Sequence, residues 1–442
     1  MTGGGGERLA LRGRFLDVSA ICDQPEEIPG KVRHEEDGLL LIEDGLIRWF
    51  GPWSEGRQRV GDGCPLHVHT DKLIVPGFVD THLHFPQSDI LGCYGEQLLE
   101  WLERFAFPAE MGQADPAVAQ EMAAFFIDQL LRHGTTSGSV FCSVHPGSVE
   151  ALFTVAQEVG MRLVAGKVLM DRHAPAPLQD TAVTGYEESK ALIEKYHDRG
   201  RLRYAITPRF APTSTPEQLE MAGTLKREFP DTHVQTHLSE NLAEIDWVRQ
   251  LFPERKNYLD VYHHYGLTGP LCNFAHCLHL EDAEWEVLAA TDSVISFCPT
   301  SNLFLGSGLF DLGRARRHGI RVGVATDVGG GTSFSMLRTL SEAYKVVRLQ
   351  DQKMTPWDAF YSATLGGARA LSLDHQVGSF DVGKEADCVV LDPQATDLQA
   401  RQYRQDRPVE DLFFSFITHG DDRSISHTYV GGRLVHERRQ DA

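Results

Sequence analysis

Eight apolar runs rich in β-branched residues alternate with helical patterns through the middle of the chain. The runs lie at residues 73–84, 135–141, 162–170, 201–210, 233–239, 271–277, 293–299 and 320–326. Segments with apolar residues at three- and four-residue spacing fill most of the gaps, among them residues 117–131, 148–160, 185–196 and 216–229. Eight strands alternating with helices over about 300 residues predict a closed (β/α)8 barrel of the TIM type. A doubly wound open sheet is the alternative.

The two ends of the chain have a different texture. Short strand-like runs with turns occupy residues 9–76, where Glu43-Asp44-Gly45 between two apolar runs indicates a hairpin. Similar runs return at residues 386–393 and 427–435. We expect the two ends to pair as one small discontinuous β-sandwich domain, formed by residues 1–75 and 376–442. Residues 76–375 would then form the barrel domain.

Composition excludes several classes of function. The chain has 62 acidic and 42 basic residues and a formal net charge of −20, which repels nucleic acid. No run approaches the roughly 18 apolar residues that a membrane helix needs. The eight cysteines are scattered without a Cys-x-x-Cys pair, and the chain shows no signal sequence, so we expect reduced thiols and a cytoplasmic protein. No Gly-x-Gly-x-x-Gly follows the early strands, and nothing supports a dinucleotide cofactor.

Polar side chains with metal-binding chemistry stand where the predicted strands end. His82 and His84 are two residues apart, so in a strand both imidazoles point to one face. The fifth, sixth and eighth runs end in further such residues, namely His237 with Glu240, His276, and Asp327. Each alone has an ordinary explanation as a turn former or a hydrogen-bonded histidine. Because the carboxyl ends of barrel strands meet at one mouth, their recurrence predicts a metal site there.

Three histidines and a carboxylate suit Zn²⁺ with an open position for water. Fe²⁺ accepts the same ligands, so the identity of the ion is left open. Asp327 can bind the ion and accept a proton, and Glu240 is placed to carry that proton to a ring nitrogen and then to a leaving amine. The alternative for Glu240 is a capping carboxylate at the start of the next helix.

A missing residue bears on the number of ions. A bridged two-metal site would want a lysine on the fourth strand, and the fourth run has none. Lys167, on the third run, is the nearest lysine and is interpreted as structural or substrate-side. One metal ion is therefore expected, which disfavours two-metal hydrolysis of cyclic amides.

The quoted residues resemble the amidohydrolase superfamily, in its mononuclear metal-dependent deaminase branch, and within that branch the guanine deaminases. The stretches that carry the resemblance are Pro76-Gly-Phe-Val-Asp-Thr-His-Leu-His-Phe-Pro-Gln-Ser88, residues 95–110, Thr207-Pro-Arg-Phe210, Thr236-His-Leu-Ser-Glu-Asn241, His276, residues 298–308 and Thr326-Asp-Val-Gly-Gly-Gly331. The likeness itself runs through nearly the whole chain.

The resemblance implies hydrolysis of guanine to xanthine and ammonia in purine catabolism or salvage, by a homodimer. It assigns the metal to His82, His84, His237 and Asp327, makes Glu240 the proton shuttle, and places His276 beside the reacting water. It also implies that Gln87, Arg209 and Phe210 hold the purine. That assignment is chemically sensible, because Gln87 both donates and accepts, Arg209 offers only donors, and Phe210 supplies a flat apolar face. The alternative for Arg209 is an ordinary ion pair.

Residues 95–110 are expected to form a helix over the mouth of the barrel, either as a lid or as packing against the rim or a second subunit. Other enzymes built on the same site remain alternatives: cytosine deaminase, an adenosine-type deaminase or a triazine chlorohydrolase. A scaffold that has lost its chemistry is a further alternative, but such a protein is expected to lack the ligands that this chain has.

Overall fold

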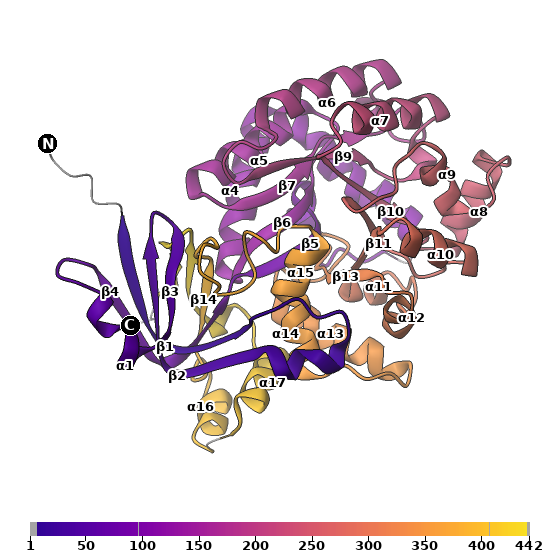
Figure 1. The fold of residues 1–442 in the computed structure, drawn as a ribbon. Helices are drawn as coiled ribbons and strands as arrows, with labels where there is room; N and C mark the ends of the chain where they lie inside the picture. The colour runs from indigo at the N-terminus through magenta and orange to yellow at the C-terminus, as the bar shows by residue number, and fades with distance from the viewer. Residues whose placement is uncertain (1–6, 96, 406, 440–442) are drawn as a thin grey trace, which may run out of the picture.

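The computed structural model of the protein describes residues 7–95, 97–405 and 407–439. A barrel ringed by helices lies beside a separate sheet, and both ends of the chain run into that sheet (Figure 1). The amino-terminal residues 1–6, on which the absence of a signal sequence partly rests, lie outside the described residues.

The barrel contains eight parallel strands in the order β5-β6-β7-β9-β10-β11-β12-β13, and a short strand, β8, pairs with β9. Their bounds are Phe78–His84, Thr135–Phe141, Arg162–Gly166, Leu202–Pro208, His233–Leu238, Cys272–His276, Val294–Phe297 and Arg321–Val324, with β8 at Val168–Leu169. The first and last strands approach each other at the mouth, where the backbone N–H of Asp327 donates to the carbonyl of His82 at 3.0 Å. The predicted barrel is confirmed over the open sheet.

Helices connect the barrel strands and follow the last of them. They are α4 Pro116–Arg132, α5 Pro146–Val159, α6 Ala182–Tyr196, α7 Pro216–Glu228, α8 Leu242–Leu251, α9 Tyr258–His264, α10 Asp282–Ala290, α11 Pro299–Phe304, α12 Leu312–Arg317, α13 Met336–Leu349, α14 Pro356–Ala363 and α15 Leu365–Ala370. Local sequence sets where several begin. In α7, for example, the Thr215 side chain accepts from the N–H of Gln218 and Pro216 occupies the first turn, where its missing N–H costs nothing.

The second sheet has seven strands in the order β16-β15-β14-β4-β1-β2-β3. Their bounds are Arg433–Glu437, Ile425–Val430, Cys388–Leu391, Leu66–Pro76, Arg8–Val18, Val32–Glu43 and Leu46–Pro52. The antiparallel pair β4–β14 joins the two ends of the chain, as predicted, in one continuous sheet. Helices α1 Trp53–Gly56, α16 Asp397–Tyr403 and α17 Val409–His419 belong to the same terminal segments. The proposed domain boundaries at residues 75/76 and 375/376 stay a prediction.

The apolar run 73–84 is two strands rather than one. Strand β4 ends at Pro76 in the second sheet, and β5 begins at Phe78 in the barrel. Gly77 makes the step between them: its N–H donates to the carbonyl of Asp387 at 3.0 Å, and a Cβ at this position would lie 2.0 Å from Oγ1 of Thr136. Only a residue without a side chain fits where the two sheets pass so close.

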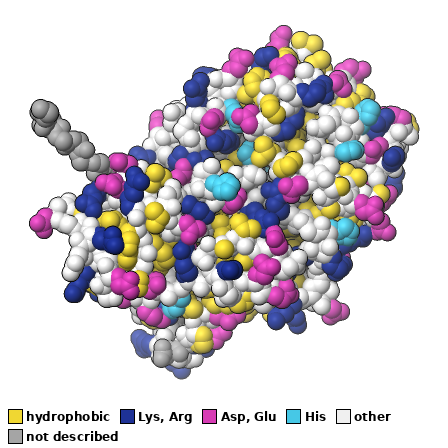
Figure 2. Space-filling view, viewed as in Figure 1, with side chains coloured by type: hydrophobic (Ala, Val, Ile, Leu, Met, Phe, Trp, Pro, Cys, Tyr) yellow, Lys and Arg dark blue, Asp and Glu magenta, His cyan; other side chains and the backbone are white. Residues whose placement is uncertain are grey.

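The face of the molecule shown in Figure 2 is mixed in charge: acidic and basic side chains are interspersed on it, and apolar side chains are scattered among them. In the described part of the chain, no helix combines the length and the apolar character needed to span a bilayer. All eight cysteines are free thiols.

Candidate metal centre and adjoining pocket

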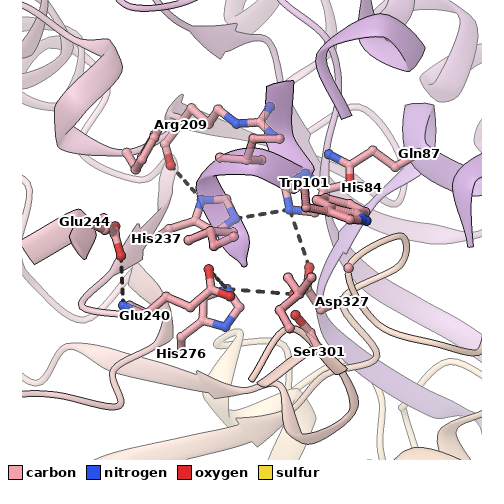
Figure 3. Close-up of a pocket in the computed structure, with 15 residues that line it drawn as sticks. His84, Gln87, Trp101, Arg209, His237, Glu240, Glu244, His276, Ser301 and Asp327 are labelled. Carbon is pink, nitrogen blue, oxygen red and sulfur yellow. Dashed lines mark hydrogen bonds and ion pairs between the residues drawn. The ribbon is translucent and has the colours of Figure 1, made fainter. Parts of the chain in front are cut away.

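The strand-end residues meet at the mouth of the barrel. His82 and His84 lie at the end of β5, His237 near the end of β10 and His276 at the end of β11, and Asp327 follows β13. Figure 3 shows His84, His237, His276 and Asp327 pointing toward one another from these separate strands. All five side chains are buried or nearly so. Residues 245 positions apart therefore share one site because parallel strands end at the same rim.

Three imidazole nitrogens and one carboxylate oxygen converge at the mouth of the barrel. Nε2 of His84 lies 3.2 Å from Nε2 of His82 and 3.1 Å from Nε2 of His237. Oδ1 of Asp327 lies 3.3 Å from Nε2 of His82 and 3.5 Å from Nε2 of His84. Ligand atoms about 2.1 Å from one tetrahedral ion lie about 3.4 Å apart, so each of these four distances matches a pair of ligands of one ion. His82 belongs both to the group with His84 and His237 and to the group with Asp327.

Protonation favours the same conclusion. Burial, together with the neighbouring histidines, lowers the pKa of both His84 and His237 well below the ordinary value, so both rings are neutral at pH 7. Nδ1 of His237 lies 2.7 Å from the carbonyl of Arg209 and donates to it, which leaves the lone pair on Nε2 facing the cluster. Neutral imidazoles with free Nε2 lone pairs are metal ligands.

Cys298 also lies near the cluster. Its sulfur falls within 4.8 Å of ligand atoms of His82, His276 and Asp327. However, the Cys298 thiol donates to the carbonyl of Ser296 at 3.4 Å, whereas the imidazole nitrogens and the Asp327 carboxylate face one another. The imidazole and carboxylate set is therefore the better fit.

Glu240 and His276 form a second, contiguous group. Oε2 of Glu240 lies 3.3 Å from Nε2 of His276, and Oε1 accepts from the Ser307 hydroxyl at 3.1 Å. Burial raises the pKa of Glu240 to about 7. Burial alone would lower the pKa of His276, but the carboxylates of Glu240 and Asp327 outweigh it and raise that pKa. A carboxyl that titrates near neutrality is suited to both accept and return a proton.

The capping alternative for Glu240 is wrong. The cap of α8 is made by Asn241, whose side chain accepts from the N–H of Ala243, and by Glu244, which accepts from the N–H groups of Glu240 and Asn241 at 3.0 and 3.1 Å. Glu240 stands just before the cap with its carboxylate free to face His276 (Figure 3).

Asn302 and Asp80, to which the sequence analysis gave no role, hold residues of the site in place. Asn302 accepts from Nδ1 of His276 at 2.8 Å, which turns Nε2 toward Glu240. Asp80 accepts from the N–H and the hydroxyl of Thr326 at 3.1 and 2.5 Å, tying β5 to the segment that carries Asp327. Asp80 shares a strand face with His82 and His84, and that alternation is the signal that could have identified it.

A pocket of about 410 Å³ opens beside the cluster and reaches all three residues expected to hold a purine, Gln87, Arg209 and Phe210. The predicted helix over the mouth is realised as α2 Leu98–Trp101, a π-helical turn at Leu102–Ala106 and α3 Phe107–Met111, while residue 96 lies outside the described residues. Leu98, Trp101 and Leu102 line the pocket.

Glu110 is the main pocket-side residue that the sequence analysis missed. It is fully buried, pairs with Arg209 at 2.6 Å and accepts from the amide of Gln87 at 2.7 Å. No pattern in the sequence signals it, because the two partners lie 23 and 99 positions away. The ion-pair alternative for Arg209 is therefore realised within the pocket itself.

Lys167 is not placed to bridge two metal ions, because its ammonium is already engaged by two carboxylates. Its buried ammonium pairs with Asp180 at 2.5 Å and with Glu188 at 3.3 Å. The strand in fourth place, β9, contains no lysine. His279 is hydrogen-bonded to the carbonyl of Ser307 at 2.8 Å, in keeping with an ordinary structural histidine.

Comparison with known proteins agrees with this architecture. Residues 73–435 match the amidohydrolase family. Guanine deaminase of Escherichia coli is 57% identical over 429 residues, covering 97% of this chain and 98% of that protein, and a solved structure of the E. coli enzyme superimposes with a TM-score of 0.96 at 56% identity, covering 98% and 100% of the two chains.

Two more distant structures share the fold. Guanine deaminase from C. acetobutylicum, solved with guanine bound in its active site, is 28% identical with a TM-score of 0.87, covering 97% of this chain and all of that one. An adenosine deaminase from Xanthomonas campestris with bound zinc is 21% identical with a TM-score of 0.82, covering 96% and 92% of the two chains, and shows the fold alone. The chain belongs to the amidohydrolase family.

Proposed function

We propose that this protein is a guanine deaminase, which hydrolyses guanine to xanthine and ammonia and so serves purine catabolism or salvage. The observation that carries the proposal is a cluster of three imidazole Nε2 atoms and one carboxylate opening directly onto a pocket that contains Arg209 and Phe210. The 57% identity to the E. coli enzyme over nearly the full length of both chains supports guanine over other amino-substituted heterocycles.

One divalent ion would be held by His82, His84, His237 and Asp327. The donor set favours Zn²⁺, and the zinc bound by the X. campestris relative is in keeping with that choice. When bound, such an ion supplies hydroxide near neutral pH by lowering the pKa of water.

Glu240 and Asp327 manage the protons in this proposal. Glu240, with a pKa of about 7, takes the first proton of water as the oxygen bonds to C2 of guanine, and it passes this proton to N3 as the C2=N3 double bond opens. Asp327 takes the second proton, from the hydroxyl on C2; this proton passes to the 2-amino nitrogen, C2=O forms, and the C2–N bond breaks to release ammonia. Nε2 of His276, 3.3 Å from Glu240, stabilises the negative charge that develops at the tetrahedral carbon's oxygen.

The pocket residues recognise the purine. Arg209 carries only donors, so it matches the O6 carbonyl of guanine and not an amino group at that position. Gln87 donates and accepts, and the ring of Phe210 covers a face of the base. Leu98, Trp101 and Leu102 exclude water from the remaining sides.

We further propose a homodimer located in the cytoplasm. The eight free thiols are in keeping with a reducing compartment. The homodimer rests on the resemblance to guanine deaminases, and the molar mass in solution tests it.

The test is ammonia release from guanine, adenine and cytosine, each incubated separately with purified protein of known metal content. Fast turnover of guanine alone is expected. Turnover of cytosine or adenine with none of guanine would overturn the assignment in favour of another deaminase on the same site.

A further inference from the structure

Glu110 connects the two polar side chains of the pocket. Its Oε1 accepts from Nε2 of Gln87 at 2.7 Å, and both of its oxygens contact Nη1 of Arg209 at 2.6 Å. Glu110, Gln87 and Arg209 are all buried, at 0%, 2% and 2% exposure. Burial of a charged pair carries a large desolvation cost, which only good geometry and further hydrogen bonds offset.

We propose that Glu110 is a positioning residue that fixes the pattern of donors and acceptors presented to the purine, and thereby sets the specificity of the pocket. The inference rests on the proposed function, in which Gln87 and Arg209 contact guanine. Glu110 acts only through these two side chains.

The orientation of the Gln87 amide follows from Glu110. A carboxylate accepts hydrogen bonds and does not donate them, so the amide must turn its NH₂ group toward Glu110. The carbonyl end, Oε1, then faces the other way, where the N–H of Gly329 lies at 3.4 Å. With an amide in place of Glu110, either end of Gln87 could face it, and the polarity of Gln87 in the pocket would no longer be fixed.

The guanidinium of Arg209 is held on two sides by one turn of α3. The ring of Phe107 lies 5.4 Å from Cζ of Arg209, and Glu110, three residues further along the helix, takes the charge. Both carboxylate oxygens contact the same nitrogen, Nη1, instead of forming the two-nitrogen fork. Among the described residues, the side-chain hydrogen bonds of Arg209 all involve Nη1, so Nη2 is left for a ligand.

The position of Glu110 itself is secured from the barrel. The hydroxyl of Ser143, just after β6, donates to the carbonyl of Glu110 at 3.1 Å. The helical segment over the mouth therefore does not only cover the pocket. Its last turn is hydrogen-bonded to the rim of the barrel and carries Glu110, which orients Arg209. In this proposal, Glu110 on α3 determines how Arg209 recognises the 6-position of the purine.

The experiment compares the wild type with Glu110→Gln, using guanine as substrate and hypoxanthine and adenine as competitive inhibitors. These two probes lack the 2-amino group and differ at the 6-position, where one has a carbonyl and the other an amino group. For E110Q we expect KM to rise about 10- to 100-fold with kcat within about threefold, as expected for lost hydrogen bonds to charged groups. The preference for hypoxanthine over adenine should fall by at least about tenfold.

Glu385→Gln is the matched control, since Glu385 bonds to Arg162 and Arg201 well away from the pocket. It should leave KM and the inhibitor preference unchanged. An unchanged KM and preference in folded E110Q would overturn the inference while leaving the proposed function intact. A wild type that does not turn over guanine would instead refute the proposed function.

Glu110→Asp covers the case in which E110Q does not fold. It keeps the charge but withdraws the carboxylate by one methylene, so it cannot reach both partners, and KM and preference should shift the same way by several-fold. Wild-type values for both in E110D would count against the positioning role.

Discussion

At the scale of single residues, position along a strand decides what a buried histidine does. His233 and His237 both belong to β10 and lie four residues apart. His237, near the carboxyl end, turns Nε2 into the cluster of His82 and His84, whereas His233, at the amino end, bonds through Nε2 to the carbonyl of Leu371 at 2.9 Å. Residue type cannot distinguish the roles of these two histidines. Their positions along the strand do, because functional side chains of a barrel lie at the carboxyl ends of its strands.

Glu240→Gln should remove most turnover without removing the ion. The substitution keeps the size and the contact with Ser307 but cannot take up a proton, so kcat should fall by about 10²–10⁴. Turnover and metal content per chain are measured on the same sample. The control is Glu284→Gln, a buried carboxylate that caps α10. Loss of the ion with activity retained would refute the role of Glu240.

His233 should make the fold sensitive to acid. Burial lowers the pKa of His233 from 6.5 to about 4, so the unfolded chain binds this proton more readily than the folded one. The contribution to stability is complete above pH 6.5 and is lost as the pH falls toward 4, by about 3 kcal/mol in total.

Denaturant unfolding between pH 7 and pH 4.5 measures the effect. His233→Gln should flatten the decline in the free energy of unfolding, whereas replacement of the exposed His375 should not. An identical decline in H233Q and the wild type would show that His233 is not responsible.

At the scale of elements, periodicity predicted most of the barrel, and its failures have physical causes. The helices were evident because each buries one face, which gives apolar residues at three- and four-residue spacing. The strands were evident because barrel strands are buried on both faces, which gives continuous apolar runs. The division of residues 73–84 into two strands was not evident, because the apolar run continues through Gly77. Only the lack of space for a side chain at Gly77, next to Thr136, reveals the step between the strands. The backbone at His276 and Asp327 has φ of 72° and 50°. Such local conformations are imposed by the assembled site and are not encoded in strand propensity.

Thr326→Val should loosen the closure of the barrel between β5 and the segment after β13. It removes the hydroxyl that donates to Asp80 at 2.5 Å and leaves a fully buried carboxylate short of one partner. We expect a loss of about 1–3 kcal/mol in the free energy of unfolding. Thr154→Val, at an exposed helical position, serves as the control. Equal stability of T326V and wild type would argue against this bond as a closure element.

At the scale of the whole molecule, the site exists only when the barrel is complete. The proposed metal ligands were predictable from sequence because each lies near or just after the carboxyl end of a strand, and the strand ends of one barrel meet. Glu110 was not, since it comes from a helical segment outside the barrel and its bond to Arg209 spans 99 positions. Asn302 lies in a stretch that the sequence analysis quoted, residues 298–308. Its role was not predictable, because its contact with His276 depends on how α11 packs against β11.

Removal of the ion should lower the stability of the entire fold. His82 and Asp327 come from the first strand and from the segment after the last, so an ion between them adds a link at the closure of the barrel. At free Zn²⁺ one hundred times its dissociation constant, the stabilisation is about 2.7 kcal/mol. Thermal unfolding with and without chelator measures this, and His82→Ala should make the melting temperature insensitive to Zn²⁺. A chelator effect that persists in H82A would place the stabilising ion elsewhere.

The most direct test of the account is a titration of metal-free protein with Zn²⁺ while guanine turnover is followed. Activity should rise in proportion to the ion added and level off at one ion per chain. A plateau at two ions per chain, or full turnover of guanine by the metal-free protein, would contradict it.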